Sequence, residues 1–381
     1  MTVLLRFKWR RSFSSLSSSL SQRHSDQVSN ITPAISALIG RDLHRQQNHP
    51  ICIVKDLVKE SFLSTPLLDQ LPPIVKVKNN FDDLLIPTNH VSRSPSDTFY
   101  VDSETVLRTH TSAHQTDLIK SGYKEFLLCG DCYRRDEIDA SHYPAFHQIE
   151  GVRLFPQSST SEQEVIHDLK TSLETTVKHV LSNSGPEGED LDVRWIDAYF
   201  PFTHPSFEME VLYRGKWLEI LGCGAIHPGV FKSAGVEDQG LTGWAFGIGL
   251  ERLAMAMFDI PDIRLFWSQD DRFLSQFRSG DRSVRFEAYS KYPPCIKDIS
   301  FWIPQGFVEN DLFAYVRETA GDLVESVALV DQFNCKQTSR SSRCYRITYR
   351  SMDRNLTNNE VDAIQDQLRQ HIEQYINVQL R

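Results

Sequence analysis

A ring, an amide and a carboxylate stand at alternate positions in this sequence, on Phe146, Gln148 and Glu150. Because side chains alternate along a β-strand, these three would share one face. Arg134 precedes them in the same stretch, Leu127–Phe155, which reads LLCGDCYRRDEIDASHYPAFHQIEGVRLF. Guanidinium, amide and carboxylate groups that converge in this way would bind a molecule carrying both anionic and cationic groups.

The sequence around these groups predicts the hairpin that must position them. Two apolar-flanked runs, Phe126–Tyr133 and Phe146–Phe155, bracket a charged centre at Arg134–Pro144, as expected for two antiparallel strands with a long tip. His142 lies on that tip. A charged tip standing alone is more often a solvated loop than a site. A functional interpretation therefore depends on further motifs.

The second motif is Gly243–Asp259, GWAFGIGLERLAMAMFD. Gly247 and Gly249 permit a tight passage from strand to helix, and the apolar residues that follow have the spacing of a buried helix face. Arg252 falls in the first helical turn, where a guanidinium beside unpaired helix N–H groups makes an anion site suited to a nucleotide phosphate. The spacing is not GxGxxG, and the sequence has no GxxxxGK[ST] loop. Phosphate must therefore be bound without a Rossmann or Walker loop.

A third candidate stretch is Val106–Gln115, VLRTHTSAHQ. It is expected to be extended, with His110 and Ser112 on one face and Gln115 closing it. A serine nucleophile would need an oriented base and an elbow such as GxSxG, and neither is present. These residues are therefore candidates for binding rather than for nucleophilic attack.

Two strands, Val193–Phe202 and Phe207–Leu212, are expected to follow, with Phe200 and Phe202 projecting from the same face across Pro201. Core packing is the usual role of such a pair. If a ligand side chain lies against them, it must be apolar and is best matched by an aromatic ring.

Glu219 is the one candidate for metal binding, and its neighbours in the strand Trp217–Gly224 are apolar. Such a carboxylate can bind a metal or an amine, and an exposed acid at a strand edge is an equal alternative. Cys129 and Cys132 form one CxxC pair, but a structural zinc site needs a second pair, so both are interpreted as strand residues.

The length of 381 residues predicts two or three domains, and the net charge of -9 means that any nucleic-acid surface must be locally basic. Residues 1–28 begin with a basic, serine-rich run without acids, which is the composition of an organelle transit peptide. An ordinary disordered basic tail is the alternative. No apolar run is long enough to span a bilayer, so no membrane segment is expected.

The composition shifts beyond Pro261, and the charged residues 268–285 are predicted to form a linker. The following pattern predicts a strand at Lys297–Ile303, a helix at Asp311–Ala320, strands at Val324–Asp331 and Cys344–Tyr349, a helix opened by a Thr357/Glu360 capping box and ending near Tyr375, and a last strand at Val378–Leu380. This order, βαββαβ, is that of a ferredoxin-like split unit. Basic residues gather around its central hairpin: Lys336, Arg340, Arg343, Arg346, Arg350 and Arg354.

Together these stretches resemble motifs 2 and 3 of the class II aminoacyl-tRNA synthetases, and the whole chain resembles the single-chain organellar phenylalanyl-tRNA synthetases. The matching segments HTSAHQ, YRRDEIDASHYPAFHQIEG, YFPF and GWAFGIGLER occur in the family's order, and the resemblance runs from about His44 to the C-terminus. Two departures are Tyr100, where bacterial members have Trp, and Asp136, where they have Glu.

The resemblance implies the roles of the candidate residues. ATP would be bound by Arg134, Asp136, His142, Phe146 and Arg252, with Arg134 and Arg252 as the catalytic pair. Phenylalanine would be bound by His110, Ser112, Gln115, Gln148, Glu150, Phe200, Phe202, Ala245 and Gly247. The resemblance also implies that the basic hairpin, through Arg343, Arg346 and Arg350, would contact tRNA. Glu219 is the candidate ligand for Mg²⁺ because of its own setting in the strand.

The expected fold is α+β: a catalytic domain at residues 29–267 built on an antiparallel sheet with helices, and a ferredoxin-like anticodon-binding domain at residues 286–381. The expected protein is a monomer that activates L-phenylalanine with ATP and charges tRNA(Phe) in the mitochondrial matrix, with the plastid stroma as a second location. Two alternatives are a synthetase-like paralogue that only binds RNA, which would be expected to lose Arg134 or Arg252, and a class II synthetase for another amino acid, against which Phe200 and Phe202 argue.

Overall fold

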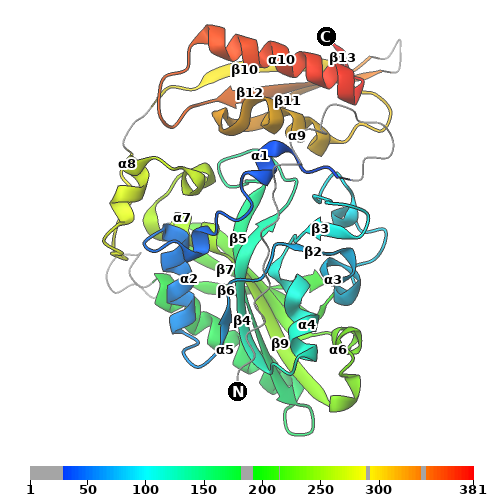
Figure 1. Cartoon of the computed structure of the whole chain (residues 1–381), viewed down its shortest axis with the longest axis vertical. Helices are drawn as coiled ribbons and strands as arrows, with labels where there is room; N and C mark the ends of the chain where they lie inside the picture. The colour runs from blue at the N-terminus through cyan, green and yellow to red at the C-terminus, as the bar shows by residue number, and fades with distance from the viewer. Residues whose placement is uncertain (1–28, 182–191, 214, 289–291, 336–339) are drawn as a thin grey trace, which may run out of the picture.

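The computed structural model describes residues 29–181, 192–213, 215–288, 292–335 and 340–381. It shows a larger unit built on a seven-stranded sheet and, stacked on one end of it, a smaller unit built on a four-stranded sheet (Figure 1). The predicted transit peptide and Lys336 lie outside the described residues.

The large sheet has the strand order β1-β4-β5-β9-β8-β7-β6. Its strands are β1 (Leu67–Leu68), β4 (Glu125–Tyr133), β5 (Ala145–Pro156), β6 (Val193–Phe200), β7 (Thr203–Tyr213), β8 (Lys216–Ile226) and β9 (Leu241–Gly249). All neighbours are antiparallel except β1 and β4. The predicted antiparallel sheet and the β4–β5 hairpin are confirmed.

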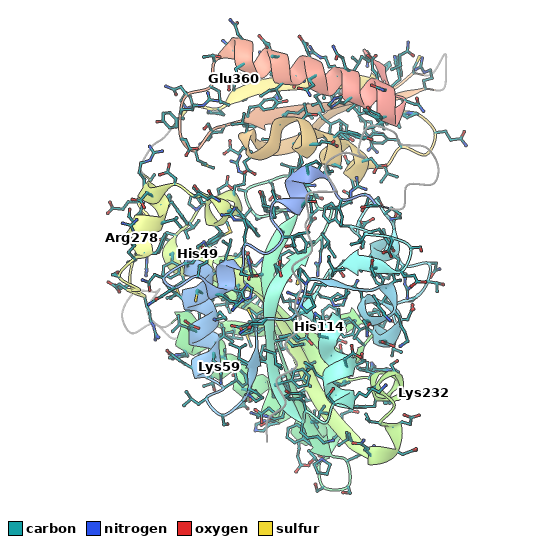
Figure 2. The ribbon with its side chains drawn as sticks, viewed as in Figure 1. His49, Lys59, His114, Lys232, Arg278 and Glu360 are labelled. Atoms are coloured by element: carbon teal, nitrogen blue, oxygen red, sulfur yellow. The ribbon has the colours of Figure 1, made fainter. Side chains whose placement is uncertain are left out.

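Helices cover both faces of this sheet. Leu127, Cys129 and Ile149 belong to the core under α2 (Pro50–Glu60), α5 (Glu162–Leu181) and α7 (Leu250–Phe258). The intervening residues Phe126 and Leu128 pack toward α4 (Gln115–Lys120) and α6 (Pro228–Ala234). Because both faces are covered, every residue of β4 from Phe126 to Tyr133 is buried, whichever face it points to. Burial of each large apolar side chain contributes about 1.5–3 kcal/mol to the stability of the fold. Figure 2 shows His114 within this layered unit.

A two-stranded ribbon and a short 3₁₀ turn lie outside the large sheet. β2 (Ile74–Lys76) and β3 (Thr105–Leu107) pair as a separate ribbon, and α3 (Val77–Asn80) follows β2. After β3 the chain forms the 3₁₀ turn η5 (Thr111–His114) rather than the extended segment expected from the sequence. The turn directs Ser112 and Gln115 differently from a strand, in which alternation alone would set their directions.

Residues 268–285, expected to be a linker, contain α8 (Asp271–Leu274) and the 3₁₀ turn η8 (Ser275–Phe277). Phe273 and Phe277 are fully buried in the first core, where their rings lie 5.2 Å apart. The charged residues on either side of them, Asp271, Arg272 and Arg278, are exposed. The linker prediction was wrong here because the polar average composition of the segment outweighed two apolar residues at helical spacing.

The small unit confirms the predicted βαββαβ order. It consists of β10 (Cys295–Trp302), α9 (Glu309–Ala320), β11 (Val324–Asn334), β12 (Ser341–Tyr349), α10 (Asn358–Ile376) and β13 (Gln379–Leu380), with the sheet order β11-β12-β10-β13. Thr357 caps α10 by accepting the Glu360 backbone N–H. The Glu360 carboxylate pairs with Arg354. No helix of the described residues has the length and apolar character needed to cross a membrane.

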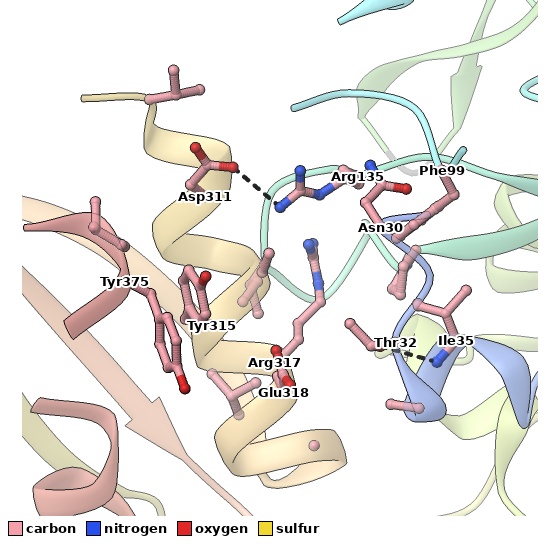
Figure 3. A pocket seen from close by; sticks show the side chains of 18 of the residues that line it. Asn30, Thr32, Ile35, Phe99, Arg135, Asp311, Tyr315, Arg317, Glu318 and Tyr375 are labelled. Atoms are coloured by element: carbon pink, nitrogen blue, oxygen red, sulfur yellow. Dashed lines mark hydrogen bonds and ion pairs between the residues drawn. The ribbon is translucent and has the colours of Figure 1, made fainter. Parts of the chain in front are cut away.

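The tip of the β4–β5 hairpin packs against the small unit. Ile138 is buried in the core of that unit, and its carbonyl accepts the Val327 backbone N–H. Arg317 of α9 donates to the carbonyls of Asp136 and Glu137. A cavity of about 380 Å³ lies between the tip, α1 (Pro33–Ser36) and α9 (Figure 3). The tip is therefore held by both units.

Candidate active site

A cavity of about 530 Å³ opens on the β5 face that carries Phe146, Gln148 and Glu150. It brings together fourteen of the residues that the sequence singled out: His110, Ser112, Arg134, Asp136, His142, Phe146, Gln148, Glu150, Phe200, Phe202, Glu219, Ala245, Gly247 and Arg252. They come from strands β5, β6, β8 and β9, helix α7, and the turns and hairpin tip beside them. Residues far apart in the chain thus share one site.

One end of the cavity holds a buried carboxylate, Glu150. It accepts hydrogen bonds from the hydroxyls of Ser112 and Thr111, and its second oxygen has no partner among the described residues. Burial raises the pKa of Glu150 to about 7, although the hydroxyl bonds act in the opposite direction. Burial and the charge of Arg134 lower the pKa of His110 to about 3, so its imidazole is neutral. An incoming ammonium group would find an acceptor here.

The apolar end is formed by two stacked rings and small residues. Phe200 and Phe202 have ring centroids 6.1 Å apart and an interplanar angle of 19°. β6 ends at Phe200, so Phe202 lies in the turn before β7 rather than in the predicted strand. Gly222 leaves room for Phe200, because a Cβ atom there would lie 2.8 Å from its ring. Gly247 likewise leaves room for the Gln148 amide.

Arginines gather at a third end. The Arg134 guanidinium donates to the Thr109 carbonyl at 2.9 Å and lies 5.1 Å from the centre of the Phe146 ring. Arg252, in the first turn of α7, donates to the Glu219 carbonyl at 3.0 Å. His142 is held by Asp139 through Nδ1 at 2.9 Å. The cavity can therefore accommodate a planar ring and anionic groups.

A carboxylate that the sequence analysis missed, Glu208 on β7, also lines the cavity. Burial raises its pKa, and the negative charges of Glu219 and Glu210 raise it further. Two nearby carboxylates of this kind are a donor set for a hard divalent cation. The sequence did show an acid, Glu208, on the strand that precedes the strand of Glu219. That the two acids lie close together follows from the pairing of β7 with β8, which the sequence alone does not give.

Gln115 is the predicted binding residue of the large unit that does not line this cavity. It is buried, and neither of its amide atoms has a hydrogen-bond partner among the described residues. It is the first residue of α4, directly after η5.

Two of the three predicted tRNA-binding arginines lie on β12 and the third, Arg350, follows it, and each has a different partner. Arg346 pairs with Asp298 through two bonds of 2.9 Å, and Arg350 lies 3.0 Å from Glu325. Arg343 donates to the Tyr345 hydroxyl, on the side of the strand that packs toward the helices. These arginines therefore do not form one uniform basic surface.

Comparison with known sequences agrees with this architecture. The family profile described as tRNA synthetases class II core domain (F) matches residues 35–277, and the ferredoxin-fold anticodon binding domain matches residues 290–381. The two matches follow the larger and smaller units in order.

Three relatives align over nearly the whole chain. The chloroplastic/mitochondrial phenylalanine–tRNA ligase of Arabidopsis thaliana is 48% identical, over 94% of this chain and 84% of that protein. The mitochondrial phenylalanine–tRNA ligase of Mus musculus is 46% identical, over 93% and 86%. That of Saccharomyces cerevisiae is 39% identical, over 93% and 92%. With both domains in place, the chain belongs to the organellar phenylalanine–tRNA ligase family of class II tRNA synthetases.

Proposed function

We propose that the protein activates L-phenylalanine with ATP and transfers the phenylalanyl group to the terminal ribose of tRNA(Phe) during organelle protein synthesis. The observation that carries this proposal is one cavity with three chemically distinct ends: a buried carboxylate, a stacked aromatic pair and two arginines. An amino acid with an aromatic side chain and a nucleotide together need these three environments.

The amino-acid part of the site follows from the first two ends. Glu150 and Ser112 bind the ammonium group, and His110 and Gln148 orient the backbone of the amino acid. The Phe200 and Phe202 rings face the substrate ring, since aromatic pairs favour offset or edge-to-face contact. Ala245 and Gly247 form the floor of the ring pocket. The sequence also implied a role for Gln115, whose buried amide atoms have no hydrogen-bond partner among the described residues.

The nucleotide part uses the arginines. Arg134 holds the α-phosphate, Phe146 stacks on adenine, and Arg252 covers the other face of the base, with His142 and Asp136 at the phosphates. Attack of a carboxylate on a phosphate brings like charges together, so positioned guanidinium groups lower the barrier by electrostatic stabilisation. The step needs no side-chain nucleophile.

The carboxylates of Glu208 and Glu219 fit a Mg²⁺ ion, because they are oxygen donors whose mutual repulsion a divalent cation would relieve. When bound, Mg²⁺ would neutralise phosphate charge and orient the triphosphate. Arg252 lies 3.4 Å from the Glu219 carboxylate between charged atoms, so its guanidinium already offsets part of that negative charge.

The small unit would hold tRNA for the second step, and the proposed location is the mitochondrial matrix, with the plastid stroma as a second site. A single chain carries both units, in keeping with a monomer. Residues 29–267 are proposed as the catalytic domain and residues 286–381 as the tRNA-binding domain.

Pyrophosphate exchange with each amino acid in turn tests the proposal. Phenylalanine should support exchange, and tyrosine should do so weakly, because an apolar pocket rejects an added hydroxyl only by about a hundredfold. Arg134→Ala and Arg252→Ala should each abolish exchange while the thermal unfolding transition persists. Exchange that depends on another amino acid, or that survives in both variants at the parent rate, would refute the assignment.

A further inference from the structure

The two side chains proposed to enclose adenine come from different elements, and one carboxylate joins those elements. Phe146 lies on β5 and Arg252 on α7. Their chain neighbours, His147 and Glu251, are in contact: both Glu251 oxygens accept the His147 backbone N–H, at 2.9 and 2.8 Å. The His147 ring adds a third bond from Nδ1, at 2.7 Å.

The register of the sheet explains why a carboxylate stands at this point. β9 pairs with β5 as far as Gly249, which lies opposite Gln148, and the chain then turns into α7. His147 is one residue beyond that last pair, so the β9 ladder no longer supplies an acceptor for its backbone N–H. A buried N–H without an acceptor costs about 1–3 kcal/mol. The Glu251 carboxylate takes the place of the missing strand residue.

The contact has little freedom to move. The side chain of His147 is 0% exposed and that of Glu251 is 4% exposed. The His147 ring stacks on Trp267 at 5.4 Å and lies 5.3 Å from the His44 ring. Hydrogen bonds to a carboxylate are about twice as strong as neutral ones, so the end of β5 and the first turn of α7 are held as one piece.

We propose that Glu251 is a positioning residue for the ATP site: by holding β5 to α7 it fixes the spacing between Phe146 and Arg252, and so sets the gap that adenine enters. This inference rests on the proposed function, since it concerns the base-binding part of that site. Glu251 itself lines the cavity, and it acts through His147 on β5 and Arg252 on α7. A displacement of about 1 Å in the side chains that position a substrate can lower the rate about a hundredfold, so loss of the contact between His147 and Glu251 should be measurable.

The test compares Glu251→Ala and Glu251→Gln with the parent chain in pyrophosphate exchange. Glu251→Ala should raise the KM for ATP by about 10- to 100-fold while the KM for phenylalanine changes by less than about threefold. Inhibition of aminoacylation by adenosine should weaken by a similar factor, and inhibition of aminoacylation by pyrophosphate should not. Glu251→Gln keeps one acceptor oxygen for the His147 N–H, so its effects should be intermediate.

The matched control is Asp168→Asn. Asp168, on α5, accepts a hydrogen bond from the Trp244 indole at 2.7 Å and pairs with Arg153, so it also joins a helix to the sheet through a carboxylate. Neither Asp168 nor Trp244 lines the cavity. This variant should lower the unfolding temperature but leave the KM for ATP at the parent value.

The outcomes separate this inference from the proposed function. If the parent chain neither binds ATP in calorimetry nor exchanges pyrophosphate, both fail. If the parent is active and both Glu251 variants keep its KM for ATP, the positioning role alone is refuted. The same holds if the KM values for ATP and phenylalanine rise equally, or if adenosine and pyrophosphate inhibition weaken equally. Should Glu251→Ala fail to fold, Glu251→Gln decides the question through the same ratios.

Discussion

Glu150 should make the binding of phenylalanine depend on pH. Its buried carboxyl has a pKa of about 7, and only the ionised form can pair with the ammonium group of the substrate. Because the pKa is raised, protonation begins well above the usual range of a glutamate. The KM for phenylalanine should therefore increase about tenfold for each pH unit below about 7 and level off above it. Pyrophosphate exchange across this range measures the effect.

Glu150→Gln provides the control, and its stability has a defined sign. A carboxyl whose pKa is raised in the folded state favours folding at low pH, and this contribution is lost as the pH rises through about 7. As the pH rises from 4.5, the ordinary pKa of a glutamate, to about 7, the unfolding temperature of the unliganded parent should fall more steeply than that of the variant. The variant should have a high, pH-independent KM for phenylalanine. A persisting pH dependence in the variant would assign the titration to another group.

The ring pocket can be narrowed or widened by one methyl group. Gly222→Ala would place a Cβ atom 2.8 Å from the Phe200 ring and force that ring toward the substrate, so the KM for phenylalanine should rise. Ala245→Gly removes a methyl group from the pocket floor and should increase the use of para-substituted phenylalanines. Both are measured as ratios of kcat/KM between phenylalanine and its para-substituted analogue, with about 1–3 kcal/mol expected for a misplaced methylene. Unchanged ratios would remove these residues from the pocket.

At the scale of elements, the segment around α8 should contribute strongly to stability despite its charged composition. Phe273 is fully buried, and its ring lies 5.8 Å from that of Phe286 and 6.5 Å from that of Phe266. Phe273→Ala should lower the free energy of unfolding by about 3–5 kcal/mol. Arg278→Ala, in the same segment but on the surface, should change it by less than about 0.5 kcal/mol. Urea unfolding of the two variants would compare them, and equal stabilities would mean that the segment behaves as a linker.

These elements also show what can be predicted from a sequence. The β4–β5 hairpin and the βαββαβ unit could be predicted because periodicity and caps are local signals. Phe273 and Phe277 were missed because the surrounding charges set the average composition. The contact between His147 and Glu251 spans 104 positions in the chain, and no spacing rule reports which strand end a helix will meet. The motif residues other than Gln115 line one cavity, whereas the contacts that support them depend on tertiary pairing.

At the scale of the whole molecule, the small unit should influence the nucleotide site through the hairpin tip. Arg317 of α9 donates to the carbonyls of Asp136 and Glu137, while Asp136 and His142 of the same tip line the active cavity. Arg317→Ala should release these carbonyls and raise the KM for ATP several-fold, with little effect on the KM for phenylalanine. Arg369→Ala, which removes an exposed arginine from α10, is the control. An unaltered KM for ATP in Arg317→Ala would show that the tip keeps its conformation without α9.

The salt dependence of tRNA binding should identify which face of the small unit contacts RNA. Arg346 projects from β12 on the side opposite Tyr345, and Arg350 follows the last residue of that strand and pairs with Glu325, whereas Arg343 donates to the Tyr345 hydroxyl. The pair between Arg346 and Asp298 is partly exposed, so water screens it and a phosphate can compete for the guanidinium. Counterion release makes binding weaken with salt by a log–log slope of about -0.7 to -0.9 per phosphate contacted.

The double variant Arg346→Gln/Arg350→Gln should therefore flatten this slope by about 1.4 to 1.8, because two phosphate contacts are lost. Pyrophosphate exchange should be unchanged, since neither arginine lines the active cavity. Arg343→Gln should lower the unfolding temperature through its lost bond to Tyr345 but leave the slope nearly intact. A filter-binding titration at several salt concentrations measures all three chains. If Arg343→Gln flattens the slope and the double variant does not, tRNA binds toward the helical side of β12 instead.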